Sequence, residues 1–301
     1  MNLHLENVSL QSRSGPNHFA SKLTKELVHS GISLNHNEEP DARLCFIETH
    51  KTFTDDVPLF QRLDGIYFNI TQNYNQQNAN IKRTYDISDG VVFQSHFNKE
   101  LITKYFGGHV NHTVIHNGAD LEYISSQPAL ESRHLDKFEN VWCCASSWRP
   151  HKRLQENVRY FLEHSSEKDC LIIAGTSDAP VPKEERVLYA GDLTISQLLS
   201  LYKRSKYLIH LAWLDHCPNV VVDARAAGCQ IICSSAGGTK EIAGTDATVI
   251  EEDEWDFAPV KLYEPPKLDF GRKINNIWDV DIDITSTAKK YKNFLFSEAS
   301  I

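Results

Sequence analysis

The stretch AWLDHCPNVVVDARAAGCQIICSSAGGTKEIAG, residues 212–244, is the most informative part of the sequence. Asp215 and Asp223 stand eight positions apart with a proline between them, and a short apolar run leads into Gly237 and Gly238. A glycine pair lets the backbone approach a ligand closely, and the helix predicted after it presents N–H groups and the positive end of a dipole. The pattern indicates a cradle for a diphosphate at the end of a strand.

The two aspartates fit the same interpretation, because a carboxylate accepts hydrogen bonds from the hydroxyl groups of a sugar. Each feature taken singly also fits a plain turn with solvated aspartates at helix boundaries. Their combination and order favour a ligand site over that alternative.

Outward from this stretch, short apolar runs alternate with amphipathic runs, which is typical of βαβ units and a parallel sheet. Strands are predicted over 3–10, 44–49, 65–70, 90–95, 113–120 (running into a turn), 141–146, 170–175, 187–191, 207–212 and 230–235. Helices are predicted over 18–29, 97–106, 154–164, 195–204, 220–227 and 285–296, with a short one after residue 238.

This rhythm is interrupted once, over 121–138, where the sequence is polar, contains a proline and has no clear period. We interpret that segment as a linker between a domain over 1–120 and a second domain over 139–284, with a C-terminal helix over 285–301. The predicted fold class is α/β, with two Rossmann-like halves facing each other across a cleft. Ligands are expected at the carboxyl ends of the strands.

Composition narrows the range of functions. The formal net charge of −9 argues against nucleic acid as the main partner. No apolar run approaches the ~20 residues of a membrane span, and the first residues lack the apolar segment of a secretion signal. Seven cysteines without a disulfide-like pattern favour reduced thiols and a cytoplasmic location. The scattered histidines show no metal-ligand spacing, so neither a metal nor a cofactor is predicted.

Together these motifs resemble those of the retaining GT-B glycosyltransferases of family 4. That family carries E-x7-E, a helix ending in A-x-G, a strand and a GG-x-x-E turn. The matching elements here are D-x7-D, ARAAG ending at Gly228, and GGTKE over 237–241. Three further matches are SGPNHFASKLTKEL over 14–27, HNGAD over 116–120 and ASSWRPHKRL over 145–154.

The resemblance implies transfer of a sugar from a UDP- or GDP-sugar to an acceptor, with retention of configuration and without metal. Lys152 matches the lysine that neutralises the donor diphosphate, Asp223 the carboxylate on the ribose, and Asp215 the one near the transferred sugar. Two departures are present. Both family glutamates are aspartates, one methylene shorter, and the family arginine position is Ser147, while Arg149 lies only three residues before Lys152.

Further site residues follow from the same resemblance. The other positions expected around the donor are Arg149, Asn219, Val220, Gly237, Gly238 and Thr239. The positions expected on the acceptor side, in the first domain, are Gly15, His50 and Asp64, the last two also as catalytic candidates. A histidine at a strand end is equally often structural.

The acceptor is not predicted beyond three classes: a glycan, a lipid-linked molecule or a small molecule. Two rival functions remain. One is a nucleotide-sugar epimerase or phosphorylase on the same fold, since a fold does not fix a function. The other is a catalytically inactive protein that binds a nucleotide or sugar.

Overall fold

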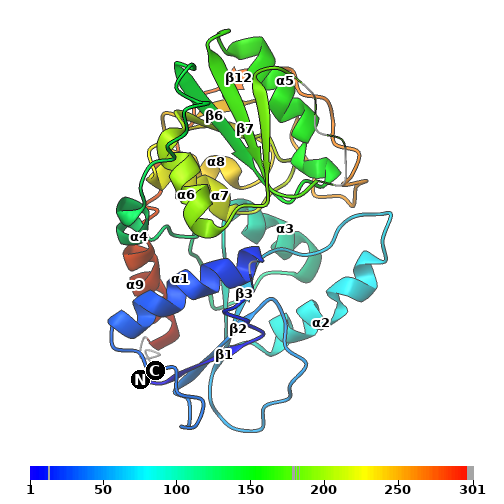
Figure 1. The fold of residues 1–301 in the computed structure, drawn as a ribbon. Helices are drawn as coiled ribbons and strands as arrows, with labels where there is room; N and C mark the ends of the chain where they lie inside the picture. The colour runs from blue at the N-terminus through cyan, green and yellow to red at the C-terminus, as the bar shows by residue number, and fades with distance from the viewer. Residues whose placement is uncertain (13, 178–179, 181, 183, 297–301) are drawn as a thin grey trace. The chain divides into compact units, whose positions relative to one another are not determined.

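The computed structural model describes residues 1–12, 14–177, 180, 182 and 184–296. The chain divides into two compact units (Figure 1). The first unit consists of Met1–Gly118, Phe257–Val260 and Asp281–Ile301, and the second of Ala119–Asp256 and Lys261–Val280.

The first unit is built on a parallel sheet. In its described residues the sheet has five strands in the order β1-β2-β3-β4-β5. These are β1 (Leu3–Glu6), β2 (Ala42–Phe46), β3 (Leu59–Leu63), β4 (Gly90–Phe93) and β5 (His112–Val114). The helices of this unit are α1 (Gly15–His29), α2 (Tyr74–Ile87), α3 (His96–Phe106) and α9 (Ile284–Phe296).

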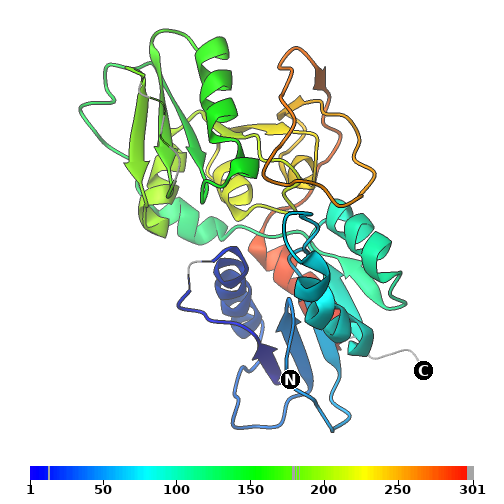
Figure 2. The ribbon, with the colours of Figure 1, turned by 90° about the vertical axis from the view of Figure 1, so that its right-hand side faces the viewer.

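Helices cover both faces of this first sheet. Phe60 of β3 packs in an apolar cluster with residues of α1 and α9, and its ring meets that of Phe294. The next residue, Gln61, donates to the carbonyl of Ile81 in α2. Since neighbouring strand residues point to opposite faces, α1 and α9 lie on one side of the sheet and α2 on the other (Figure 2).

The second unit holds a larger sheet. Among the residues that the structure describes it has seven strands in the order β12-β11-β10-β9-β6-β7-β8, and only β12 is antiparallel. These are β6 (Asn140–Ala145), β7 (Asp169–Ala174), β8 (Val187–Gly191), β9 (Tyr207–His210), β10 (Gln230–Ser234), β11 (Thr248–Ile250) and β12 (Lys273–Ile274). The helices are α4 (Leu121–Ser126), the 3₁₀ turn η1 (Pro150–Lys152), α5 (Leu154–His164), α6 (Ile195–Arg204), α7 (Asn219–Ala226) and α8 (Thr239–Ile242).

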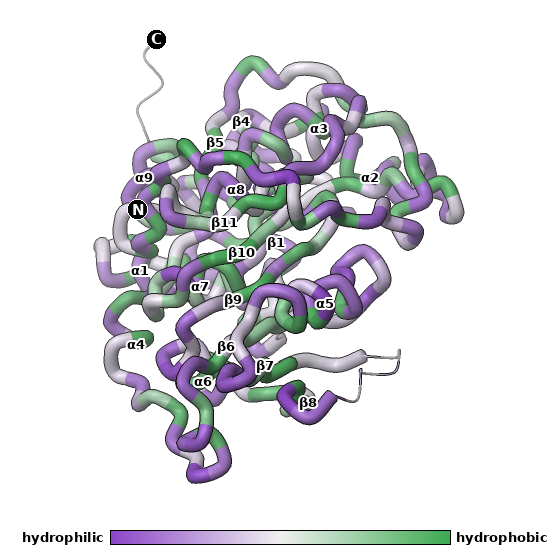
Figure 3. Tube along the Cα trace, turned by 90° about the horizontal axis from the view of Figure 1, so that it is seen from above, coloured by the Kyte–Doolittle hydropathy of each residue, from purple (hydrophilic) through white to green (hydrophobic). Residues whose placement is uncertain are grey.

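The strand order of the second sheet reverses at β6. The chain proceeds from β6 through β7 to β8 on one side and returns to β9 on the other. In open α/β sheets such a switch point is where ligands bind, beyond the carboxyl ends of the strands. The interior of the sheet is apolar: along β10 the tube in Figure 3 is largely green, and Ile231–Ser234 is buried.

Most predicted elements of the second unit agree with the structure to within two residues, and the helix over 154–164 agrees at both ends. In the first unit the strand predicted over 65–70 is wrong, because the strand there is β3, which ends at Leu63. Its residues Gln61 and Arg62 are polar but fully buried, so a search for apolar runs does not find this strand. The strand predicted over 3–10 ends at Glu6, where Asn7 turns to a φ of 58°.

Two helices, α2 and α4, are absent from the sequence prediction. The segment of α2 reads YNQQNANIKRTYDI, which has few apolar residues at helical spacing. The structure caps it with Asn73, whose side chain accepts a hydrogen bond from the Gln76 amide. The segment predicted as a linker contains α4, which Asp120 caps in the same way. Later in the same segment, the amide of Leu130 donates to the carbonyl of Ser200 in α6.

All seven cysteines lie in the described residues, where each is buried and none forms a disulfide. Within the same residues no helix has both the length and the apolar character needed to cross a membrane.

Candidate nucleotide-sugar site

The candidate site of the second unit lies where the chain leaves β6 and β9, the two neighbouring strands at the switch point. After β6 the chain forms η1, which carries Lys152, and after β9 it turns through Leu214 to Asp215. Leu214 has a φ of 58°, so the backbone is left-handed just before the carboxylate. Two residues that are 63 positions apart in the sequence are thereby placed in contact.

The carboxylate of Asp215 accepts hydrogen bonds from a lysine, a histidine and a backbone amide. Lys152 Nζ lies 2.5 Å from its Oδ2, and His210 Nε2 lies 2.9 Å from the same oxygen. The backbone amide of His216 donates to Oδ1 over 3.0 Å. The side chains of Lys152 and Asp215 are 19% and 14% exposed, so the ion pair is reachable from solvent.

The electrostatics of the group follow from these contacts. Burial alone would raise the pKa of Asp215, but the charge of Lys152 and the hydrogen bond from His210 outweigh it and hold that pKa well below its usual range. Burial lowers the pKa of His210, and it lowers the pKa of His151 to about 3 and that of His216 to about 4. At neutral pH the site therefore contains one ammonium, one carboxylate and neutral imidazoles.

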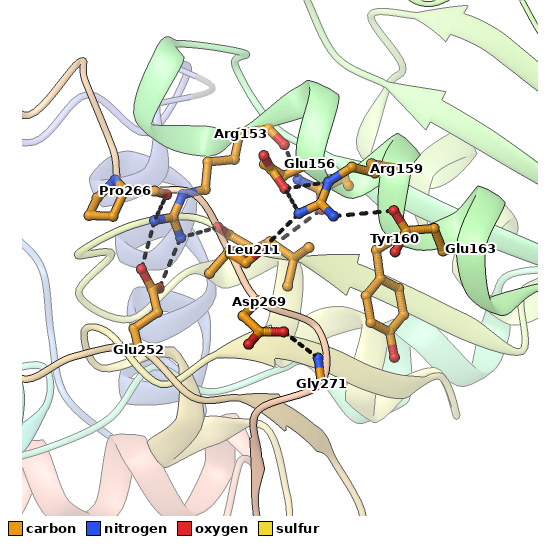
Figure 4. A network of polar contacts seen from close by, with 12 residues as sticks. Arg153, Glu156, Arg159, Tyr160, Glu163, Leu211, Glu252, Pro266, Asp269 and Gly271 are labelled. Atoms are coloured by element: carbon orange, nitrogen blue, oxygen red, sulfur yellow. Dashed lines mark hydrogen bonds and ion pairs between the residues drawn. The ribbon is translucent and has the colours of Figure 1, made fainter.

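The backbone beside Lys152 is held by Arg153, a residue that the sequence did not single out. Arg153 has a φ of 55° and is buried, and its guanidinium binds both carboxylate oxygens of Glu252 at 2.9 and 2.6 Å (Figure 4). It also donates to the carbonyls of Leu211 and Pro266. A bidentate pair fixes orientation as well as distance, so Arg153 ties η1 to the end of β9 and to the segment after β11.

Asn157 in α5 makes a second connection between the two strand ends. Its Nδ2 donates to the carbonyls of Lys152 and Arg153, and its Oδ1 accepts from the amide of Leu211 over 3.3 Å. It is fully buried. The position of Lys152 relative to Asp215 is therefore set by buried polar contacts of the backbone as well as by the ion pair itself.

The glycine loop after β10 lies directly on the backbone of Asp215. Gly237 pairs with Asp215 in a parallel bridge, and the amide of Gly238 donates to the Asp215 carbonyl over 2.8 Å. A Cβ atom at Gly237 would lie 2.5 Å from that carbonyl oxygen. The next residue, Thr239, is fully buried, and its hydroxyl has no hydrogen-bond partner among the described residues. The carboxylate and the glycine loop thus form one structural element.

Asp223 lies inside α7, one turn after the helix begins at Asn219, and it is 7% exposed. The alternative of a solvated helix-boundary residue is therefore wrong for Asp223. Asn219 and Val220, both half-buried, form the first turn of α7, where backbone N–H groups have no partner within the helix.

Arg149 and Ser147, the two candidates for the family arginine position, lie before η1. Both are exposed, and the amide of Arg149 donates to the carbonyl of Ser147. In the described part of the chain the Arg149 side chain makes no hydrogen bond or ion pair. The arginine of this loop whose side chain is held by hydrogen bonds is Arg153. Its sequence signal, a basic residue directly after Lys152, is shared by many solvated loops.

The candidates of the first unit follow its strands. Asp64 comes directly after β3 and binds the guanidinium of the fully buried Arg62, which also donates to Asn117 Oδ1 over 2.7 Å. Burial raises the pKa of Asp64 despite the charge of Arg62, and its Oδ2 is buried without a hydrogen-bond partner in the part of the chain that the structure describes. His50 is exposed after β2, and Gly15 is the first residue of α1.

Solved structures with this architecture were found. The chain superposes on Anabaena HepE in complex with UDP-glucose with a TM-score of 0.68 and 13% identity, covering 99% of this chain and 100% of that one. It also matches WaaG, a glycosyltransferase of lipopolysaccharide biosynthesis (TM-score 0.59, 10% identity, 99% and 96% covered). The chain has the GT-B fold. A third GT-B match is sucrose-phosphate synthase from Thermosynechococcus elongatus (TM-score 0.62, 11% identity, 84% and 86% covered).

No family model matches the sequence, and no curated protein does. At such low identities the likeness establishes the GT-B fold, and the activity has to be argued from the site.

Proposed function

We propose that this GT-B chain is a glycosyltransferase of the retaining family 4 type, which transfers a sugar from a UDP- or GDP-sugar to an acceptor. The observation that carries the proposal is the Lys152–Asp215 pair beside the Gly237–Gly238 loop, at the switch point of the second sheet. It places a cation, a carboxylate and a close-approach backbone within one small region. The GT-B neighbour HepE was solved with UDP-glucose, which agrees with such a donor.

In the proposed reaction the second unit stabilises the departing nucleoside diphosphate. Lys152 supplies the counter-charge, and the exposed Arg149 adds a second cation. The loop of Gly237, Gly238 and Thr239 and the first turn of α7, with Asn219 and Val220, bring backbone N–H groups toward the phosphates. This is electrostatic preorganisation toward charge that develops as the glycosidic bond breaks, and the proposal requires no metal.

The two aspartates bind the hydroxyl groups of the donor. Asp223 binds the ribose and Asp215 the transferred sugar, where its ionised carboxylate faces the positive charge of an oxocarbenium-like transition state. The leaving phosphate takes the proton of the acceptor. Because an aspartate is shorter than the family glutamate, the donor has to lie closer to the backbone, which the glycine at 237 permits.

The first unit, centred on the predicted domain over 1–120, binds the acceptor in this proposal. Asp64 is the candidate that the structure describes best, because its buried Oδ2 has no partner among the described residues and can accept a hydrogen bond from a hydroxyl group. His50 and Gly15 are the other candidates. The acceptor is a glycan, a lipid-linked molecule or a small molecule.

A panel of UDP- and GDP-sugars tests the proposal. Isothermal titration calorimetry identifies the donor, release of nucleoside diphosphate with and without added acceptors reports transfer, and proton NMR of the product gives its anomeric configuration. Acceptor-dependent release with retention is expected. Conversion of the donor without an acceptor would instead indicate an epimerase, transfer of the sugar to inorganic phosphate a phosphorylase, and binding without turnover an inactive protein. Absence of binding to every nucleotide and nucleotide sugar would refute the proposed function.

A further inference from the structure

His210 contacts the proposed site from its buried side. It is the last residue of β9, a strand that lies between β10 and β6, and its side chain is 4% exposed. Its Nε2 binds the same oxygen of Asp215 that Lys152 binds. One oxygen thus has a buried donor and a donor that solvent can reach.

The hydrogen-bonding capacity of the carboxylate shows what a ligand must displace. A carboxylate oxygen has two acceptor positions. Both positions on Oδ2 are taken, by Lys152 and His210, and one on Oδ1 is taken by the amide of His216. A ligand hydroxyl can reach Oδ2 only after Lys152 has left it.

An anionic ligand that attracts Lys152 removes the counter-charge of Asp215. Among the described residues only Lys152 and His210 donate a side-chain hydrogen bond to this carboxylate. An ionised carboxylate that is largely buried and unpaired is strongly unfavourable. Once Lys152 has moved, His210 is the side chain that still satisfies the charge.

We propose that His210 is a positioning residue, which donates Nε2–H to Asp215 Oδ2 and holds the carboxylate in place while Lys152 moves to an anionic ligand. The proposal rests on the proposed function for the identity of that ligand. Because the acceptor is a carboxylate, the proton of the neutral ring is on Nε2. The other titratable or charged groups that interact with Asp215 are Lys152, His151 and His216, and burial keeps His210 itself neutral.

The first test needs no ligand. Carbon-13 NMR of aspartate-labelled protein follows the Asp215 carboxyl signal, which Asp215→Asn assigns, as the pH is lowered. In a Lys152→Met background, adding His210→Leu is expected to raise the titration midpoint of Asp215 by at least one pH unit. His210→Gln, whose Nε2 also donates, is expected to restore it. His164→Leu is the matched control outside the site. An Asp215 midpoint that is unchanged by His210→Leu would overturn the proposal.

The second test uses inorganic pyrophosphate as the anionic ligand. His210→Leu is expected to weaken its binding about tenfold, because Lys152 then leaves a carboxylate with no other side-chain donor. In an Asp215→Ala background the same change is expected to have no effect. An equal loss in both backgrounds would show that His210 acts through packing and would overturn the proposal.

A substitute variant and the ligand-free titration distinguish failure of this proposal from misfolding and from failure of the proposed function. His210→Asn, whose amide does not reach Asp215, replaces His210→Leu if circular dichroism shows that the leucine variant does not fold. If the wild type binds neither pyrophosphate nor any nucleotide, the proposed function fails. The NMR titration then decides the role of His210 toward Asp215 without reference to a ligand.

Discussion

Replacing Gly237 with alanine tests whether the glycine loop and the carboxylate form one element. Gly237 has a φ of 98°, and an added Cβ would lie 2.5 Å from the Asp215 carbonyl oxygen and 2.9 Å from its amide nitrogen. Both atoms belong to the backbone, which cannot rotate away as a side chain can. The loop must therefore move from Asp215, and the 2.8 Å bond from the Gly238 amide must lengthen.

The magnitude can be worked out against Gly228, which has a φ of 100° and, among the described residues, no atom within 4 Å of the place that a Cβ would occupy. Gly228→Ala carries only the conformational cost, about 1–2 kcal/mol for an L-residue in the left-handed region. Gly237→Ala adds a clash that in packed interiors costs about 1–3 kcal/mol. We expect Gly237→Ala to lower the free energy of unfolding by about 2–5 kcal/mol, and Gly228→Ala by about 1–2 kcal/mol.

Thermal unfolding measures the first quantity, since 1 kcal/mol shifts the Tm of a domain of 150–250 residues by about 2–4 °C. Calorimetric titration with UDP and GDP measures the second. Gly237→Ala is expected to weaken nucleotide binding at least tenfold, and Gly228→Ala to leave it unchanged. Equal Tm shifts and equal nucleotide affinities in the two variants would refute the reasoning.

The remaining predictions concern charge. Lys152→Ala is expected to remain folded by circular dichroism and to lose about 1.5–3 kcal/mol of diphosphate binding, roughly ten- to a hundredfold in initial rate; wild-type rates would exclude Lys152 from the site. Turnover is expected to persist in excess EDTA, and loss that Mg²⁺ or Mn²⁺ restores would contradict a metal-free site. Asp223→Ala is expected to raise the donor KM strongly and Asp223→Asn to raise it less, since an amide still accepts one hydrogen bond; equal KM values would exclude the ribose contact. Because the pKa of Asp215 is lowered, its stabilisation is present above its unfolded value near 3.9 and is lost as the pH falls through the folded pKa. The stability difference between wild type and Asp215→Asn, measured by denaturant unfolding, should therefore be constant above about pH 5 and shrink below about pH 4.

The sequence was most informative where apolar runs are short and clearly bounded. The strands and helices of the second unit are of that kind, and their alternation was enough to predict two α/β halves. It was least informative where polar residues are buried. Arg62 and Gln61 lie inside β3, where the guanidinium of Arg62 pairs with Asp64 and donates to Asn117, and the amide of Gln61 donates to the carbonyl of Ile81. A pattern of hydrophobicity cannot recognise such a strand.

In the candidate site, too, some features could be predicted from the sequence and others could not. Lys152, Asp215 and the glycine pair could be chosen from motifs, because each belongs to a short local pattern. The contact between Lys152 and Asp215 could not be predicted, because it depends on β6 and β9 being neighbours in the sheet. Arg153 was missed because its partner, Glu252, is 99 positions away. The contribution of His210 was missed for a related reason, since inside a predicted strand it had the features of a core residue.

The packing of α9 against α1 has a consequence for how the protein can be divided experimentally. Ala288, Tyr291 and Leu295 of α9 belong to the same apolar cluster as Phe19 and Leu23 of α1. A fragment that stops after the second unit would leave this apolar stripe of α1 open to water, although every strand of the first sheet would be present. Such a fragment is expected to aggregate, and adding residues 281–296 as a separate peptide should restore its solubility. The last helix of the chain thus completes the core that its first helix begins.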